Sequence, residues 1–244
     1  MTALADALLH ARRTDTLATY AAAFAVADFD AAYAVQAEVA TGLGAEVAGW
    51  KVGFAPDRTP FAAPIFRADV RPDGASWRLG AHPVKIELEL AIRLGRDLPR
   101  ASMTRETLVD SIVDVFPGIE FVQARFADAE NVPFAARVAD NFANLGYVEG
   151  APVRAFRDLA LDRLRVRVWE GDALRQDGTG THLEGDPLKP VLAWIAVAAD
   201  RFGGLKAGQF ITTGTLTVPF DVVDSCSIRG AIDGVGEVTT SLVR

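Results

Sequence analysis

The stretch Val84-Lys-Ile-Glu-Leu-Glu-Leu-Ala-Ile-Arg-Leu94 alternates polar and apolar residues over much of its length. This period of two predicts a β-strand, because successive side chains of an extended chain point to opposite faces. Glu87 and Glu89 then share one face, whereas Ile86 and Leu88 pack the other. The stretch therefore predicts a sheet on which two carboxylates stand close together.

A third acid, Glu120, follows in Pro-Gly-Ile-Glu-Phe-Val-Gln-Ala-Arg. Two carboxylates about 4 Å apart repel by roughly 4 kcal/mol at an effective dielectric near 20, so a cation between them would relieve the repulsion. A site made of oxygen ligands favours Mg²⁺ or Mn²⁺ over zinc. The alternative is an ordinary solvated strand face with mixed charges, including Lys85 and Arg93, and the spacing alone favours that alternative.

Composition narrows the class of protein. The chain has 244 residues, 50% of them hydrophobic, and its 25 basic and 32 acidic residues give a formal charge of −7, which argues against a nucleic-acid partner. Its longest apolar stretches are far shorter than the roughly 18 residues that a membrane-spanning helix needs. The order of regions typical of a signal peptide is missing, so we expect a cytoplasmic protein without a membrane partner. A single cysteine, Cys226, excludes an internal disulfide.

The predicted secondary structure changes near residue 47, from helical to mainly β. Residues 1–46 are expected to form a helical N-terminal region, with Thr14 and Asp28 as candidate caps and a helix over residues 29–43. Residues 47–244 are expected to form one compact β-rich core. Strands are predicted over residues 49–54, 84–94, 118–124, 146–149, 164–169, 209–213 and 237–243. Helices are predicted over residues 104–115 and 187–202, the second capped by Asp186. This pattern lacks a regular alternation of strands and helices, and it indicates an α+β fold.

Other residues could take part in chemistry. Lys51 shares a strand face with Gly53, and a lysine in a partly buried pocket has a lowered pKa and can act as acid or base. Residue type alone favours a solvated lysine. Asn141 could hold a ligand or form a turn, and Thr213 could bind a carboxylate or simply support a strand. No role is assigned to the histidines, which are His10, His82 and His182.

Several short motifs occur in an order that resembles the fumarylacetoacetate hydrolase superfamily. More narrowly, they resemble its 2-keto-4-pentenoate hydratase and 4-oxalocrotonate decarboxylase branch. The resemblance runs from about residue 28 almost to the C-terminus. The motifs are Trp50-Lys-Val-Gly, Glu87-Leu-Glu, Gly118-Ile-Glu-Phe-Val-Gln-Ala-Arg, Ala139-Asp-Asn and Leu205-Lys-Ala-Gly-Gln-Phe-Ile-Thr-Thr-Gly.

The resemblance implies a mixed β-roll core, usually in a homo-oligomer, and a lyase that acts on a short 2-oxo acid in the degradation of aromatic compounds. It implies that Glu87, Glu89 and Glu120 hold a divalent metal, Mg²⁺ or Mn²⁺, and that Lys51 assists proton transfer. It also implies an acidic catalytic position at Asp69 and substrate contacts from Asn141 and Thr213. Hydration of a 2-hydroxy-2,4-dienoate is the leading reaction, and decarboxylation of a related dicarboxylic acid is the alternative.

The chain departs from the branch in its pocket. After Asp140-Asn141 the branch commonly has Ala-Ser-Ser-Gly, whereas this chain has Phe142-Ala-Asn-Leu. Beside Glu120, Gln123-Ala124 replaces the usual Asp-Ser. These departures keep open a third interpretation, a catalytically reduced structural partner in an enzyme complex. The retained glutamates and Lys51 argue against it.

Overall fold

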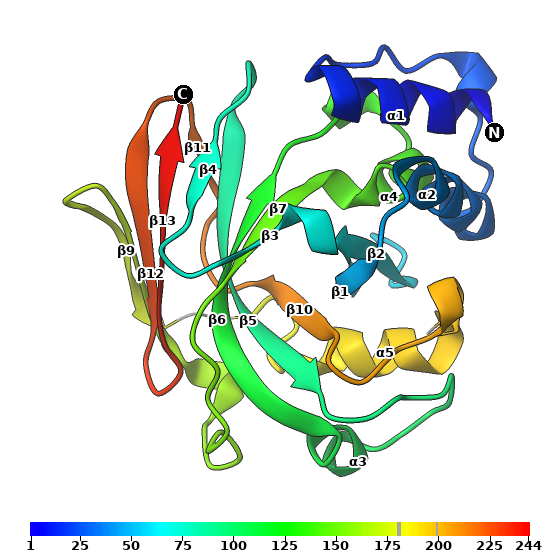
Figure 1. Ribbon diagram of the computed structural model, residues 1–244. Coiled ribbons are helices and arrows are strands. Elements are labelled where there is room, and N and C mark those ends of the chain that lie inside the picture. The colour runs from blue at the N-terminus through cyan, green and yellow to red at the C-terminus, as the bar shows by residue number, and fades with distance from the viewer. Residues whose placement is uncertain (180–181, 199) are drawn as a thin grey trace.

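Two β-sheets and a helical N-terminal part make up the protein, as the computed structural model shows for residues 1–179, 182–198 and 200–244 (Figure 1). The larger sheet has the strand order β2 (Pro60–Phe66), β1 (Val47–Phe54), β10 (Phe210–Thr215), β5 (Val84–Leu94), β6 (Ile112–Val122), β7 (Asn144–Glu149) and β3 (Val70–Pro72), and β11 (Phe220–Val222) also pairs with β5. The smaller sheet has the order β4 (Ser76–Arg78), β13 (Gly236–Val243), β12 (Cys226–Ile232), β8 (Arg165–Glu170) and β9 (Ala173–Thr179).

Both sheets are mixed. The pairs β1–β10, β3–β7 and β4–β13 are parallel, and the other strand pairs are antiparallel. The helices are α1 (Ala3–Thr14), α2 (Phe29–Leu43), α3 (Arg105–Val109), α4 (Phe134–Ala139) and α5 (Leu188–Ala198). This architecture confirms the predicted α+β fold with helices at the N-terminus. The first strand, β1, begins at Val47.

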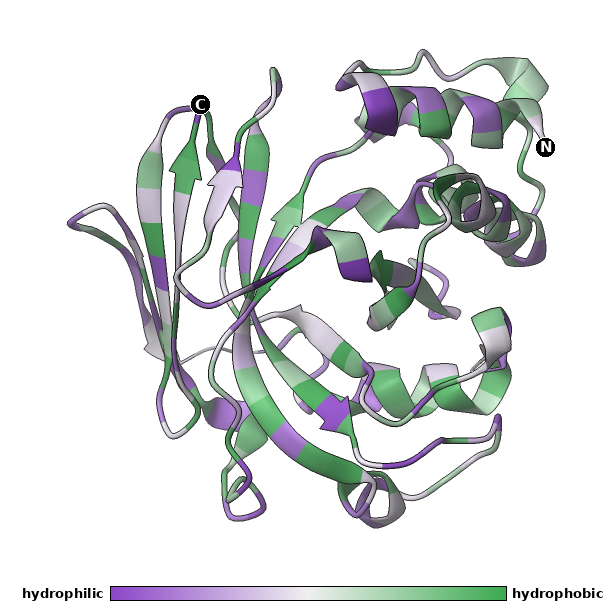
Figure 2. Ribbon diagram, in the orientation of Figure 1, coloured by the Kyte–Doolittle hydropathy of each residue, from purple (hydrophilic) through white to green (hydrophobic). Residues whose placement is uncertain are grey.

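The apolar side of β5 forms the core between the two sheets. Ile86, Leu88 and Leu90 are buried in one large cluster with residues of β12 and β13. Gly230 of β12 lies so close that a Cβ atom there would be 2.4 Å from a Leu88 methyl carbon. Figure 2 shows the alternation of hydrophobic and hydrophilic residues along the strands. The packing of the smaller sheet on this side leaves the glutamate side of β5 facing away from the core.

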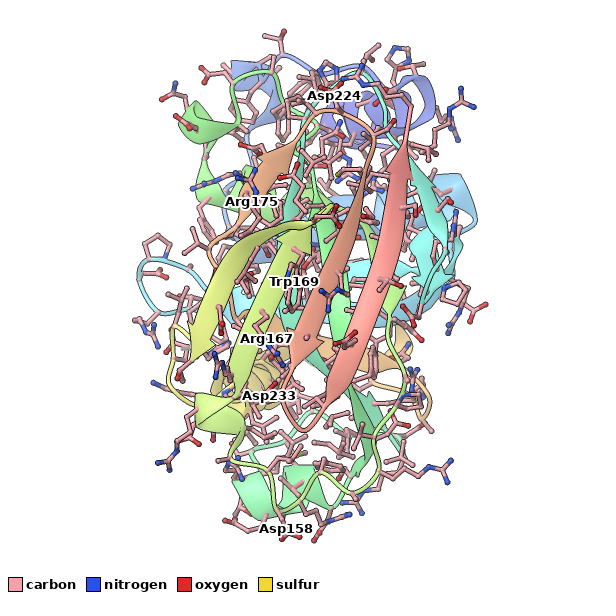
Figure 3. All side chains as sticks on the ribbon, turned by 90° about the vertical axis from the view of Figure 1, so that its left-hand side faces the viewer. Asp158, Arg167, Trp169, Arg175, Asp224 and Asp233 are labelled. Atoms are coloured by element: carbon pink, nitrogen blue, oxygen red, sulfur yellow. The ribbon has the colours of Figure 1, made fainter. Side chains whose placement is uncertain are left out.

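The outer face of the smaller sheet is charged (Figure 3). Arg167 pairs with Asp233 at 2.6 Å, and the guanidinium of Arg229 lies 3.5 Å from the ring centre of Trp169. In exposed positions such pairs contribute little to stability, but they keep an open sheet face hydrated.

The N-terminal helices form a second core with α4. Leu8, Tyr33 and Val39 pack in this cluster with Phe61 of β2. The start of α2 follows the prediction, because the Asp28 side chain caps the helix by accepting a hydrogen bond from Ala31 N at 2.9 Å. No helix in the described part of the chain is long and apolar enough to cross a membrane.

Some local predictions were wrong. Thr14 is the last residue of α1 and not a cap at a helix start; that helix is capped by Thr2. The helix predicted over residues 104–115 ends at Val109, because the β-branched residues from Ile112 onward pair with β5 and begin β6. The helix predicted over residues 187–202 is α5, whose Leu188 N donates to Asp186 Oδ1 as expected; residue 199 lies outside the described residues.

Candidate active site

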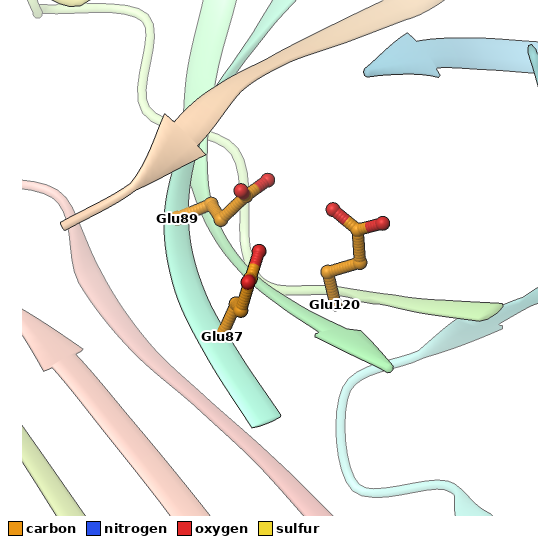
Figure 4. Close-up of side chains that lie close together, drawn as sticks. All are labelled: Glu87, Glu89 and Glu120. Atoms are coloured by element: carbon orange, nitrogen blue, oxygen red, sulfur yellow. The ribbon is translucent and has the colours of Figure 1, made fainter. Parts of the chain in front are cut away.

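Three glutamates converge on the polar side of β5 and β6 (Figure 4). Glu87 is the direct antiparallel partner of Glu120, and Glu89 lies opposite Gly118. Directly paired residues share a sheet face, so the register places all three carboxylates together. Each offers an oxygen within 4.8 Å of the others. The alternative of an ordinary solvated strand face does not fit, since Glu89 is 1% exposed and Glu120 is 0% exposed.

Two carboxylate oxygens of this cluster lack partners. Glu89 Oε2 and Glu120 Oε2 are buried and have no hydrogen-bond partner among the described residues. An unpaired buried carboxylate oxygen is costly unless a cation or a donor satisfies it. An all-oxygen set is the donor type that hard divalent cations prefer. The glutamates therefore fit a divalent metal such as Mg²⁺ or Mn²⁺.

The other oxygen of Glu120 is held by two donors from different strands. Lys51 Nζ of β1 donates to Glu120 Oε1 at 2.6 Å, and Asn144 Nδ2 of β7 donates to the same atom at 2.9 Å. These bonds fix the carboxylate through Oε1, so that Oε2 is the oxygen of Glu120 that remains for a metal. They also explain one departure from the branch, since Asn144 stands where a hydroxyl residue is common and supplies an amide to the glutamate.

Burial and mutual repulsion shift the acid–base properties of the cluster. Burial, together with the charge of Glu120, raises the pKa of Glu87 to about 6, although Lys51 lowers it. Burial and the charges of Glu120 and Glu87 raise the pKa of Glu89 well above its ordinary value. Burial alone would lower the pKa of Lys51, but the three glutamates raise it above its ordinary value. The lowered pKa of Lys51 expected from the sequence is therefore wrong for the metal-free protein. The alternative of a solvated Lys51 is also wrong, because the side chain is buried.

A strained turn brings the chain against Lys51. Asn141, Phe142 and Ala143 have φ values of 50°, 46° and 61°, a left-handed conformation that side chains rarely adopt in succession. Asn141 Nδ2 holds the turn by donating to Pro64 O at 3.1 Å. As a result the Phe142 carbonyl accepts a second hydrogen bond from Lys51, at 3.2 Å. Backbone strain of this kind concentrates at functional sites.

The pairing of strand β10 with β5 is irregular beside Glu89. The register shifts between Thr212 and Thr215, and Gly214 has φ of 109°. Thr213 Oγ1 donates to Leu90 O at 2.9 Å, and the Thr213 carbonyl lies 2.6 Å from His182 Nε2. With Nδ1 of His182 accepting from Glu184 N, the ring has its proton on Nε2. Burial lowers the pKa of this histidine, which agrees with a neutral ring.

A cavity of about 480 Å³ opens over this cluster. It is lined by Lys51, Glu87 and Glu89, by Thr213 on β10, and by aromatic residues. The size suits a small molecule rather than a polymer.

Three predicted residues are not part of the lining of this cavity: Glu120, which is fully buried in the carboxylate cluster, and Asp69 and Asn141. Asp69, in the short helix Arg67–Asp69, is 3.9 Å from Arg12 of α1, and burial raises its pKa. Asn141 is buried with its amide on Pro64 O, so that it acts on the turn. The sequence analysis assigned no role to three further residues at the site: His182 and Arg137, which line the cavity, and Asn144, which binds Glu120. Their spacing carries no signal, since Arg137 looks like any polar residue of a helix and the other two reach the site only through the tertiary fold.

Comparison with known proteins gives the family. A model of the fumarylacetoacetate (FAA) hydrolase C-terminal family matches residues 25–243. 2-Keto-4-pentenoate hydratase 1 of Dechloromonas aromatica (strain RCB) is 31% identical, over 98% of this chain and 95% of that protein. 4-Oxalocrotonate decarboxylase of Pseudomonas putida is 28% identical, over 66% of this chain and 61% of that protein.

Solved structures agree on the fold. 4-Oxalocrotonate decarboxylase from Pseudomonas putida G7, complexed with magnesium and adipate, has a TM-score of 0.88 and 23% identity, covering 99% of this chain and 97% of that one. Fumarylpyruvate hydrolase from Pseudomonas aeruginosa, in complex with Mn²⁺ and pyruvate, has a TM-score of 0.60 and 17% identity, covering 80% and 88%.

These matches confirm the resemblance found in the sequence and the fold expected from it. They also confirm the prediction of an enzyme of the hydro-lyase or carboxy-lyase type, because the relatives by sequence are hydratases and a decarboxylase. With a family model matching most of its length, the chain belongs to the fumarylacetoacetate hydrolase family.

Proposed function

We propose that the protein is a metal-dependent lyase of a short 2-oxo acid, with hydration of a 2-hydroxy-2,4-dienoate as its leading reaction. One observation carries the proposal. Glu89 and Glu120 belong to a carboxylate cluster that is joined to a buried lysine, and each has one buried oxygen without a hydrogen-bond partner in the part of the chain that the structure describes. A protein that served only as a scaffold would have no need for such an arrangement, because it is costly without a cation.

Glu87, Glu89 and Glu120 would hold Mg²⁺ or Mn²⁺. When bound, the metal would supply a positive charge that orients the 2-oxo and carboxylate oxygens of the substrate and stabilises the negative charge developing there. Two of the similar structures are described with magnesium or Mn²⁺, which supports a divalent ion without deciding between the two.

Lys51 is the residue placed to move a proton. Its ammonium group lies at the cavity wall, held by Glu120 Oε1 and the Phe142 carbonyl. The glutamates raise its pKa in the metal-free protein, so neutralising their charge lowers that pKa toward the range useful for proton transfer. We assign to Lys51 the transfer of the proton that converts the dienol into the ketone before water adds.

The remaining predicted residues have supporting roles in this proposal. Thr213 lines the cavity, and its hydroxyl, which donates to Leu90 O, can still accept a hydrogen bond from a substrate group. Asn141 fixes the turn that presents the Phe142 carbonyl to Lys51. Asp69 remains a candidate catalytic acid or base, but it would have to reach the substrate from outside the cavity lining.

Decarboxylation of a dicarboxylic 2-oxo acid is the second candidate. It is supported by the decarboxylase relative and by a structural neighbour of the same name. The structural-partner interpretation is disfavoured, since Asn144 replaces the missing hydroxyls by a bond to Glu120 and leaves the cluster intact. We also propose a homo-oligomer, as the family resemblance implies; light scattering during size-exclusion chromatography measures it.

The test is a turnover assay on the purified protein with Mg²⁺. Ultraviolet absorbance follows the loss of a conjugated dienoate, and evolved carbon dioxide is measured in parallel with a dicarboxylic substrate. We expect metal-dependent loss of the dienoate without carbon dioxide, abolished by Glu89→Gln and by a chelator. Carbon dioxide release would favour the second candidate. Absence of both reactions over a panel of 2-oxo acids, with metal bound, would contradict the proposed function.

A further inference from the structure

One positive charge in the cavity wall has no acidic partner among the residues that the structure describes. Arg137, in the last turn of α4, lines the same cavity as Lys51 and the glutamates. Its Nε is buried and has no hydrogen-bond partner among the described residues. None of the ion pairs within the described ranges 1–179, 182–198 and 200–244 involves Arg137. A guanidinium left in this state favours the binding of an anion.

Two neighbouring carboxylates of the cavity, those of Asp140 and Glu184, are already engaged in ion pairs. Asp140 pairs with Arg125 at 3.4 Å and accepts from its backbone N at 2.8 Å. Glu184 pairs with Arg58 and with Lys189. Glu130 is exposed in the short helix Ala129–Asn131 at the cavity, and it does not pair with Arg137. The guanidinium therefore remains available to a ligand.

An aromatic wall connects Arg137 with the glutamate cluster. Lys51 Nζ is 5.3 Å from the ring centre of Phe142, the rings of Phe142 and Phe134 are 5.4 Å apart, and the Arg137 guanidinium lies 5.1 Å from the Phe134 ring centre. Phe61 also lines the cavity, with its ring 4.5 Å from that of Phe142. Phe142 and Phe61 line the cavity, whereas Phe134 packs behind them and supports Arg137, so a planar conjugated chain would pack on the Phe142 and Phe61 rings.

We propose that Arg137 binds a second carboxylate at the far end of the substrate, so that the preferred substrate is a linear 2-oxo dicarboxylic acid. This inference rests on the proposed function, which places the 2-oxo end at the glutamates. The planar fork of an arginine matches a carboxylate through two parallel hydrogen bonds. An ion pair that holds the distal carboxylate in the ground state opposes its loss, so the inference also favours hydration over decarboxylation at that end.

The experiment measures binding rather than turnover. The Mg²⁺-loaded protein is titrated calorimetrically with 2-oxoadipate and with 2-oxohexanoate, which have the same carbon chain and differ only in the distal carboxylate. We expect wild type to prefer 2-oxoadipate by about tenfold or more, as is typical when a charged hydrogen-bonded pair is formed. In Arg137→Gln the preference should fall to within about twofold, and Arg137→Lys should retain part of it.

Arg165→Gln is the matched control, because Arg165 pairs with Asp177 on the smaller sheet, outside the cavity lining. It should keep the wild-type preference, and melting curves confirm that each variant is folded. Equal affinity of wild type for the two acids would overturn the role of Arg137 while leaving the proposed function in place. Binding of neither acid would overturn both. If Arg137→Gln does not fold, an unchanged preference in Arg137→Lys would refute the two-bond recognition.

Discussion

Neutralising Glu87 should stabilise the protein when metal is absent and destabilise it, relative to wild type, when metal is present. Folding raises the pKa of Glu87 from its ordinary value of 4.5 to about 6, mainly through burial and the charge of Glu120. The folded state therefore binds the proton more tightly than the unfolded state. The resulting destabilisation is absent below pH 4.5, grows as the pH rises, and is fully present above pH 6.

The size of the effect follows from the same shift. One pKa unit corresponds to about 1.4 kcal/mol, so Glu87 destabilises the metal-free fold by about 2 kcal/mol at pH 7.5. The ligand oxygens of the cluster lie within 4.8 Å of one another, and two charges at that distance repel by about 3 kcal/mol at an effective dielectric near 20, a repulsion large enough to account for the destabilisation. In a chain of this size Glu87→Gln should then raise the melting temperature by about 4–8 °C.

The assay is differential scanning fluorimetry of the chelator-treated protein at pH 7.5 and pH 5, with and without Mg²⁺. The gain of Glu87→Gln should shrink at pH 5, where Glu87 is largely protonated in the metal-free fold. Saturating Mg²⁺ at about one hundred times its dissociation constant stabilises wild type by about 2.7 kcal/mol, and the variant should gain much less. The order of the two melting temperatures should therefore reverse on adding metal.

Glu46→Gln is the matched control, since Glu46 forms an exposed pair with Arg67 and lies outside the cluster. It should shift the melting temperature little under any of these conditions. A lower melting temperature of metal-free Glu87→Gln at pH 7.5, or equal protection of wild type and variant by Mg²⁺, would refute this reasoning.

Three further outcomes are expected. Lys51→Met should keep Mg²⁺ binding in calorimetry while lowering kcat by about 10²-fold or more, the usual worth of a proton-transfer group, and an unchanged kcat would remove Lys51 from the chemistry. Gly118→Ala should destabilise the fold by about 1–3 kcal/mol in urea unfolding, because its Cβ would lie 1.9 Å from Tyr147 Oη; a neutral change would contradict this packing. Apparent Mg²⁺ affinity should fall as the pH drops through about 6, since protons compete for Glu87, and a flat profile from pH 7.5 to pH 5 would argue against that ligand.

The sequence predicts the parts of the site that depend on local periodicity. Alternation along β5 places Glu87 and Glu89 on one face, and the cap at Asp28 marks the start of α2. Local periodicity does not predict hydrogen bonds between segments that are distant in the sequence. The bond from Asn144 to Glu120 depends on the register of β6 and β7, which shifts between Phe121 and Val122.

Tertiary pairing also explains the local errors. Residues 104–115 have a helical pattern, but Ile112 and Val115 gain more from pairing with β5 than from continuing α3. β2 was not among the predicted strands, because prolines such as Pro60 and Pro64 disfavour a strand within a sheet. They are tolerated here because β2 lies at the edge of the larger sheet.

The most direct test of the account is calorimetric titration of the metal-stripped protein with Mn²⁺, with and without oxalate as a stand-in for the 2-oxo acid. The account predicts that Mn²⁺ binds, that oxalate tightens this binding, and that Glu120→Gln weakens it by at least about tenfold. A protein that binds no Mn²⁺, or binds it equally well in Glu120→Gln, would contradict the assignment of the three glutamates as a metal centre.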